Sequence, residues 1–254
     1  MKFGTLIVIF SVVSLCYAQN PDSTQNLTTF SGSVGITNNG FSIIPTFSLN
    51  SPATIINFYF QKKRFSFDPD IRLVPNASKG GLLFWFRYRL IMRKKFNLIV
   101  GTHPAFSMIR REATDSKGNT IQITETLRFI AFKVLPSYQI SPHWNVSAMY
   151  LNGNALQKHG PQRTHVLFLN SAFTNLKIGG NYRFHFTPTV FFLKLDDTSG
   201  EYFTATASIS NTQSPFSFHG TINQTLRSNI PDNQFFMWNV MLAYNFRKQL
   251  KVVK

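Results

Sequence analysis

Hydrophobic and polar residues alternate with a period of two along most of this chain. The clearest segment is 82–91, in which every second position is apolar or aromatic and Arg87 and Arg89 lie on the opposite face. A period of two places successive side chains on opposite faces of a β-strand. The same alternation recurs in 41–49, 182–192, 216–226 and 236–246. So many strands of this kind require one very large apolar surface, which lipid supplies.

Residues typical of turns separate these segments. Short breaks alternate with longer polar breaks, as short periplasmic turns alternate with longer extracellular loops in transmembrane barrels. With both ends of the chain in the periplasm we predict twelve strands, and counts of ten or fourteen also fit the pattern. The predicted strands are 28–37, 41–49, 54–67, 80–91, 96–110, 121–139, 144–152, 164–174, 180–194, 201–210, 216–226 and 234–246.

The first residues predict export. Lys2 is followed by an apolar run over 6–15, interrupted by two serines, and then by Cys16-Tyr17-Ala18. This order is typical of a secretory signal peptide, 1–18, cleaved before Gln19, and the run is too short to span a bilayer as a helix. A lipoprotein acylated at Cys16 is the alternative, but it needs a small residue where Leu15 stands. Cleavage would remove the one cysteine, so the mature chain could form no disulfide.

The composition agrees with a membrane barrel. Hydrophobic residues make up 43% of the chain, aromatic residues 15% and charged residues only 14%, whereas soluble domains carry roughly 25% charged residues. We therefore predict an all-β fold, a single antiparallel transmembrane β-barrel in the outer membrane of a bacterial cell. The predicted parts are the signal peptide (1–18), a short periplasmic segment (19–27), the barrel (28–246) and a basic periplasmic tail (247–254).

Three sequence features resemble outer-membrane barrel proteins of the Bacteroidota. They are the processing site Ala18-Gln19, the turn Ser141-Pro142-His143-Trp144, and a closing strand with Leu242, Tyr244 and Phe246 at alternate positions. The closing pattern is similar to the terminal strand that the barrel-assembly machinery reads, although 247–254 follow Phe246. The resemblance implies a location, a fold and the assembly machinery as a partner. It implies no substrate.

The net charge of +16 favours anionic partners. Export makes nucleic acid an unsuitable partner, so we expect lipopolysaccharide, outer-membrane lipid and small anions instead. The alternation points several basic side chains into the lumen, where an excess of cations attracts anions. We expect Asp68 and Asp70 to lie in loops, and Glu125 to be the one carboxylate within a strand. The expected lumen-lining basic residues are Arg87, Arg89, Lys133, Arg183 and His185.

A second basic set falls at predicted extracellular strand ends. There it would bind lipopolysaccharide phosphates, or it would be ordinary solvated loop charge. Its members are Lys62, Lys63, Arg64, Arg110 and Arg111.

We expect no enzyme and no cofactor. Asn97, His103 and Ser107 share one strand face, but along a single strand they are spaced too widely to form a triad. The histidines show no ligand spacing of the HxH or HxxxH kind, so we expect no metal.

The sequence leaves two functions open and, as a more distant option, a third. The first is a small passive, anion-preferring channel, which follows from the basic lumen. The second is a non-conducting structural or accessory subunit of an envelope complex for secretion or glycan handling, which the basic tail favours. The third is a soluble secreted β-protein that holds an apolar ligand.

Overall fold

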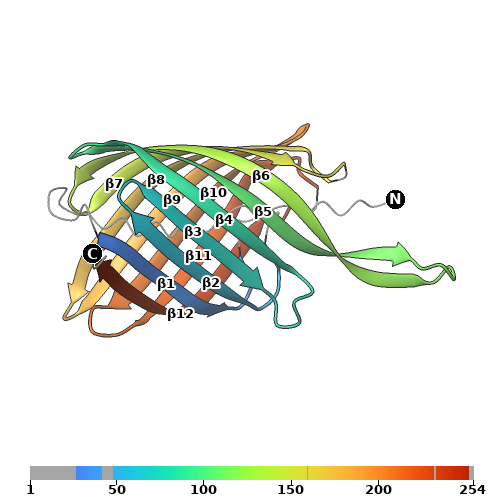
Figure 1. Cartoon of the computed structure of the whole chain (residues 1–254), viewed down its shortest axis with the longest axis horizontal. Coiled ribbons are helices and arrows are strands. Elements are labelled where there is room, and N and C mark those ends of the chain that lie inside the picture. Colours follow the sequence, from blue (N-terminus) through green and yellow to red (C-terminus); the bar gives the residue numbers. More distant parts are fainter. Residues whose placement is uncertain (1–26, 42–47, 159, 232, 252–254) are drawn as a thin grey trace.

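The computed structural model describes residues 27–41, 48–158, 160–231 and 233–251, and their strands form one closed antiparallel barrel (Figure 1). No helix in these ranges is long and apolar enough to cross a bilayer. The twelve strands are β1 (Leu27–Thr37), β2 (Ala53–Lys62), β3 (Phe65–Leu73), β4 (Gly80–Met92), β5 (Phe96–Thr114), β6 (Thr120–Ser141), β7 (Trp144–Ala155), β8 (Arg163–Gly179), β9 (Tyr182–Leu195), β10 (Thr198–Asn211), β11 (Phe216–Ser228) and β12 (Phe236–Lys251).

Each strand pairs with its neighbours in the sequence, and β1 pairs with β12 to close the barrel. β1 begins and β12 ends at one end of the barrel, which we call the turn end. The opposite end is the loop end. The connections at the turn end are 63–64, 93–95, 142–143, 180–181 and 212–215, and those at the loop end are 38–52, 74–79, 115–119, 156–162, 196–197 and 229–235.

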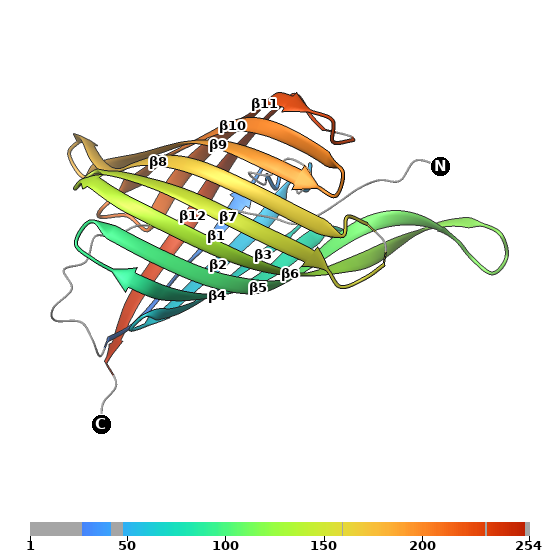
Figure 2. The ribbon, with the colours of Figure 1, turned by 90° about the horizontal axis from the view of Figure 1, so that it is seen from above.

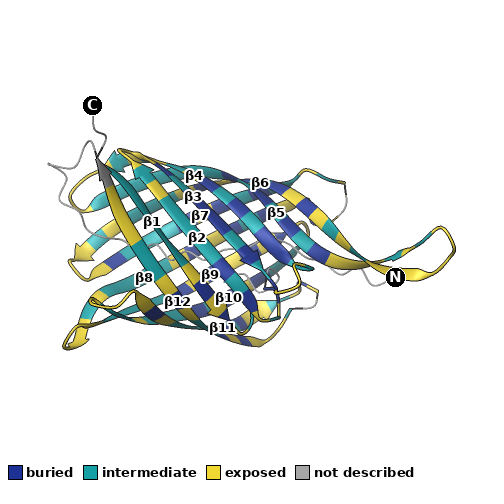
Figure 3. Cartoon of the chain, turned by 60° about the horizontal axis from the view of Figure 1, so that its bottom comes forward, coloured by how far each residue is buried: buried dark blue, intermediate teal, exposed yellow. Residues whose placement is uncertain are grey.

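Alternate side chains of each strand face lipid or lumen, and the exposed and buried positions alternate along the ribbons in Figure 3. On β4, Leu83 and Trp85 are buried, while Phe86, Tyr88 and Leu90 are exposed. The outward face of the other strands likewise carries exposed aromatic and aliphatic side chains. A closed barrel with an apolar outer face satisfies all of its backbone hydrogen bonds within the sheet, as a bilayer requires.

The hairpin of β5 and β6 extends well beyond the rest of the barrel at the loop end (Figure 2). The two strands pair from Phe96↔Tyr138 to Thr114↔Thr120. β4 stops pairing with β5 at Met108, and β7 stops pairing with β6 at Phe129. The outer part of the hairpin is therefore a two-stranded ribbon.

The prediction of one strand over 54–67 is wrong, because the chain reverses in the middle of that segment. β2 and β3 form a hairpin in which Lys62 pairs with Phe65 across a turn at Lys63 and Arg64. Lys63 adopts a φ of 53°, in the left-handed region. Asparagine or glycine usually marks such a turn, and this one has neither.

The prediction of a polar loop from residue 68 onward is also wrong. Residues 68–73 belong to β3, where Asp68, Asp70 and Arg72 alternate with the outward-facing Pro69 and Ile71. Proline has no N–H to donate, and the β2–β3 pairing is interrupted between Asn57↔Asp70 and Phe60↔Phe67, where Pro69 stands.

The predicted strand over 41–49 falls in the connection between β1 and β2, which pair directly with each other. Residues 42–47 lie outside the described residues. Phe41 and Leu49 are buried but belong to no strand. The lumen-facing Arg72 donates from Nη1 to the carbonyl oxygen of Phe41 at 3.1 Å, so the backbone at Phe41 lies against the lumen at the loop end.

The predicted signal peptide and nearly all of the predicted segment 19–27 lie outside the described residues. β1 begins at Leu27. β12 continues to Lys251 and pairs with β1 up to Leu27↔Lys251. The predicted basic tail therefore starts as part of the closing strand and not as a free segment.

Candidate functional site in the barrel lumen

The five basic side chains predicted to line the lumen all stand on inward-facing positions. Arg87 and Arg89 share the face of β4 that also carries Trp85, and Lys133 shares the face of β6 that carries Phe129 and Ala131. Arg183 and His185 share the face of β9 that carries Phe191 and Leu193. One residue of slip would exchange the two faces of a strand, so the inward position of all five depends on the strand registers.

Carboxylates also face the lumen, contrary to the sequence-based expectation. Asp68 and Asp70 lie on β3 and not in loops, and Glu125 is not the one carboxylate within a strand. Asp68 forms an ion pair with Arg87, through Oδ2 and Nη1. Asp70 accepts from Nε and Nη2 of Arg72 at 2.8 and 3.0 Å. The positive charges of Arg72 and Arg87 are therefore each balanced by a neighbouring carboxylate.

Trp85 lies at the centre of a cluster of cationic and ring side chains. Its ring is 4.3 Å from Lys133 Nζ and 5.2 Å from Arg87 Cζ, both within cation–π range. The His103 ring centroid is 3.8 Å from that of Trp85. Gly101 on β5 pairs with Arg87 on one side and Lys133 on the other, so the position between the two cations has no side chain.

The remaining basic groups of the set have polar or backbone contacts. Arg89 Nη2 lies 3.3 Å from both Tyr59 Oη and Gln61 Oε1. Arg183 Nη1 donates to the carbonyl oxygen of Tyr182. Ion pairs join Arg72 to Asp70, Arg87 to Asp68 and Arg111 to Glu125. Arg89, Lys133 and Arg183 are in none of them.

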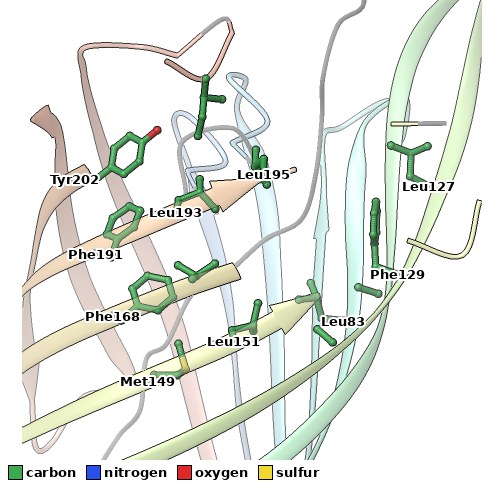
Figure 4. Packing of buried hydrophobic residues seen from close by; sticks show 14 of the residues in the cluster. Leu83, Leu127, Phe129, Met149, Leu151, Phe168, Phe191, Leu193, Leu195 and Tyr202 are labelled. Atoms are coloured by element: carbon green, nitrogen blue, oxygen red, sulfur yellow. The ribbon is translucent and has the colours of Figure 1, made fainter. Parts of the chain in front are cut away.

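The inner wall towards the loop end has a different chemistry. Side chains of β4 to β10 form a continuous apolar lining there, and Figure 4 shows them standing on the barrel wall. The rings of Phe168, Phe191 and Tyr202 follow one another along three neighbouring strands, with centroids 5.1 and 4.8 Å apart. We call this lining the apolar wall; its described members are Leu83, Trp85, Ala105, Ile109, Leu127, Phe129, Ala131, Met149, Leu151, Val166, Phe168, Phe191, Leu193, Leu195, Tyr202 and Ile230.

The apolar wall was not among the features predicted from the sequence, although the sequence carries a signal for it. Strict alternation gives way to continuous apolar runs at 82–86, 129–132, 166–169 and 190–193. Such runs indicate strands buried on both faces.

The two halves of the predicted lipopolysaccharide set lie at opposite ends of the barrel, so the prediction that they share one membrane face is wrong. Lys62, Lys63 and Arg64 surround a connection at the turn end. Arg110 and Arg111 stand near the loop end of β5, where Arg111 contacts Glu125 at 3.5 Å. None of the described connections at the turn end contains a carboxylate; their lysine and arginine residues are Lys63, Arg64, Arg93, Lys94 and Lys95.

The other sequence features have clear positions. Leu242, Tyr244 and Phe246 share the outward face of β12, where Leu242 and Tyr244 are exposed. Asn97, His103 and Ser107 stand along the inward face of β5, as the spacing predicted. Among the described residues no group of three or more His, Cys, Asp or Glu side chains could hold a metal ion.

No family model and no curated protein matches the chain. Among solved structures, it is similar to the KdgM porin, with a TM-score of 0.52 and 10% identity over 85% of this chain and 99% of that one. A KdgM porin in complex with disordered oligogalacturonate gives a TM-score of 0.50, again with 10% identity, over 86% and 99% of the two chains. At this identity the likeness concerns the fold. The fold is that of these outer-membrane barrels, which together with the apolar outer face supports a bacterial outer-membrane location.

Proposed function

We propose that this protein is a passive channel of the bacterial outer membrane that prefers anions. The observation that carries the proposal is the unequal charge inside the turn-end half and middle of the lumen. Arg87, Arg89, Lys133 and Arg183 face inward there, and among the described residues the one carboxylate in an ion pair with any of them is Asp68, which pairs with Arg87. Cations that line a pore raise the local concentration of anions and lower the barrier to their passage.

The size of the barrel supports a narrow pore. Side chains fill barrels of about eight strands, whereas barrels of sixteen or more leave an aqueous channel. Twelve strands lie between these cases, so lumen side chains would control what passes. This proposal gives the protein no catalytic role.

Single-channel recording in a planar bilayer under a salt gradient tests this function. The decisive variant replaces Arg89, Lys133 and Arg183 by Gln and keeps the Arg87–Asp68 pair intact. We expect wild-type protein to conduct with a reversal potential on the anion side. We expect the variant to lose about half of that potential at ~0.1 M salt and less at ~1 M, because salt screens the charges.

A matched control removes the same charge from the outside of the barrel. Arg110, Lys194 and Lys248 stand on outward-facing positions. Replacing these three by Gln should leave the reversal potential unchanged. An equal change in both triple variants, or none in the lumen variant, would contradict the proposal.

One observation favours the second function, a non-conducting accessory barrel. The apolar wall covers much of the loop-end half of the lumen, and hydrophobic constrictions can close a pore by dewetting. Protein that is inserted and heat-modifiable but conducts no current in the bilayer would favour this function. Purification of a native envelope complex would then identify the partner.

The proposed partners follow from position. Arg110 and Arg111, near the loop end, are suited to lipopolysaccharide phosphates if that end faces outward. The outward face of the closing strand, with Leu242, Tyr244 and Phe246, is the proposed signal for the barrel-assembly machinery. The likeness to Bacteroidota barrels and the cleaved signal peptide rest on sequence motifs.

A further inference from the structure

The turn end of the barrel (left in Figure 1) carries a row of exposed cations. The turn at 63–64 lies beside β4, because the Arg89 N–H donates to the carbonyl oxygen of Arg64 at 2.9 Å. β4 leads into the connection 93–95, and on the other side β2 pairs with β1, which pairs with β12. The cations therefore follow one another along the strand ends from β12 to β5. We call this row the basic rim; its members are Lys62, Lys63, Arg64, Arg93, Lys94, Lys95 and Lys248.

The described connections do not balance the charge of the basic rim. Those at the turn end contain no Asp or Glu, and no member of the rim is in an ion pair among the described residues. The connections at the loop end, in contrast, contain Asp115, Asp196 and Asp197. The two ends of the barrel therefore differ in their balance of charge.

A ring of aromatic side chains places the basic rim at the level of the lipid headgroups. Tyrosine and tryptophan gather where a membrane barrel passes from the apolar part of the bilayer into the headgroup region. Cations just beyond such a ring lie among the headgroups. The exposed members of the ring, close to the turn-end connections, are Tyr88, Tyr138, Trp144, Tyr182 and Tyr244.

Two members of the basic rim directly continue the lipid-facing surface. On the outer face the ring of Phe30 lies 4.6 Å from that of Phe60 and 5.4 Å from that of Phe246, between centroids. Lys62 and Lys248 are the next outward positions after Phe60 and Phe246. A soluble protein that docked on the end of the barrel would not cover these outward positions. The occupant that fits them lies in the plane of the bilayer.

We propose that the basic rim binds anionic phospholipids, with their headgroup phosphates at the rim and their acyl chains along the outer face below it. Cations at a membrane surface attract anionic lipids over zwitterionic ones, whose headgroups carry a positive charge of their own. Short turns of such barrels face the periplasm, so these lipids belong to the periplasmic leaflet. The inference concerns the outside of the barrel and holds whether or not the lumen conducts.

Two tryptophans report the lipid at the two ends of the barrel. Trp144 is at the turn end, where Gln139 donates from its N–H to the carbonyl oxygen of Lys95 and from Nε2 to that of Trp144, at 2.7 and 3.2 Å. Trp144 is thus about two strand spacings, ~10 Å, from the rim. Trp238 is exposed near the loop end of β12. Trp85 faces the lumen and adds a constant background in both reporters.

The experiment measures quenching by lipids with brominated acyl chains. Protein with Trp238→Phe reports the turn end, and protein with Trp144→Phe reports the loop end. Each is placed in mixed vesicles of phosphatidylglycerol and phosphatidylcholine, with one or the other lipid brominated. The ratio of the two quenching efficiencies gives the preference for the anionic lipid, and heat-modifiability on gels checks that each protein is folded.

We expect Trp144 to show a preference of about fivefold for phosphatidylglycerol, the effect of one cation at each headgroup. Added salt should reduce it, and Trp238 should be quenched nearly equally by the two lipids. Replacing 93–95 by three Gln should remove most of the preference at Trp144. The matched control, with Arg110, Arg128 and Lys194 replaced by Gln, removes three exposed cations near the loop end and should leave it unchanged.

Equal quenching of Trp144 by the two lipids would overturn the proposal and would direct the search to an acidic protein as the partner of the rim. A preference that persists in the folded 93–95 variant would also overturn it. The comparison of lipids uses the unaltered rim, so it decides the matter even if that variant fails to fold. Because quenching needs no current, the result is independent of the test of the channel.

Discussion

The two halves of the lumen differ far more than the two halves of the outer surface. Outside, exposed aromatic and aliphatic side chains occupy strands on all sides of the barrel. Inside, the turn-end half and middle carry Arg87, Arg89, Lys133, Arg183 and His185, while the apolar wall lines the loop-end half. Outward positions within the bilayer face lipid and favour apolar side chains, whereas a lumen position can be polar or apolar. The division of the interior is therefore the feature most directly tied to function.

The largest effect should come from placing a charge in the apolar wall. Leu193→Asp puts a carboxylate where the side chain is 0% exposed, and we expect a loss of about 3 kcal/mol or more in the free energy of unfolding. The matched variant, Ser208→Asp, puts the same group on the neighbouring strand beside His185 and His219. We expect it to change that free energy by less than about 0.5 kcal/mol.

Urea unfolding of both variants in lipid vesicles provides the measurement. Equal losses for Leu193→Asp and Ser208→Asp would mean that the two halves of the lumen do not differ in the way described.

A smaller effect should come from the ion pair between Arg87 and Asp68, whose side chains are 19% and 11% exposed. Arg87→Gln leaves Asp68 without its partner, and we expect a loss on the order of 2 kcal/mol, below that of a fully buried pair. Replacing both, by Gln and Asn, should cost less than about 1 kcal/mol. Unfolding of the two single variants and the double variant completes the cycle. Additive losses would show that the two groups do not stabilise each other.

The sequence predicted the outer face well and the lumen only in part. Around Tyr88 and Phe186, β4 and β9 alternate between outward apolar and inward polar side chains. Strand number also agreed, but 54–67 holds a hairpin, and most of 41–49 lies outside the described residues. The turn at Lys63-Arg64 contains neither asparagine nor glycine, so no turn residue marks it in the sequence. Its place follows from the pairing of the strands in the closed sheet.

The candidate site depended on contacts that no local pattern contains. Asp68 and Pro69 are residues that strands usually lack, so residues 68–73 of β3 were assigned to a loop and the partner of Arg87 was missed. The position of Trp85 between Arg87, His103 and Lys133 follows from the registers of three strands. Register depends on pairing across the whole sheet, which the composition of one segment does not reveal.

Thiol labelling of the turn-end lumen tests the central claim most directly. In a chain without Cys16, Ser208→Cys places a thiol on the inward face of β10, and Ile209→Cys places one on the outward face next to it. Small thiosulfonate reagents of either charge then report water access and the sign of the local potential. We predict that Ser208→Cys reacts about tenfold faster with the anionic reagent at low salt, that added salt reduces the ratio, and that Ile209→Cys stays protected by lipid. An unreactive Ser208→Cys, or faster reaction with the cationic reagent, would contradict a water-filled, anion-preferring lumen.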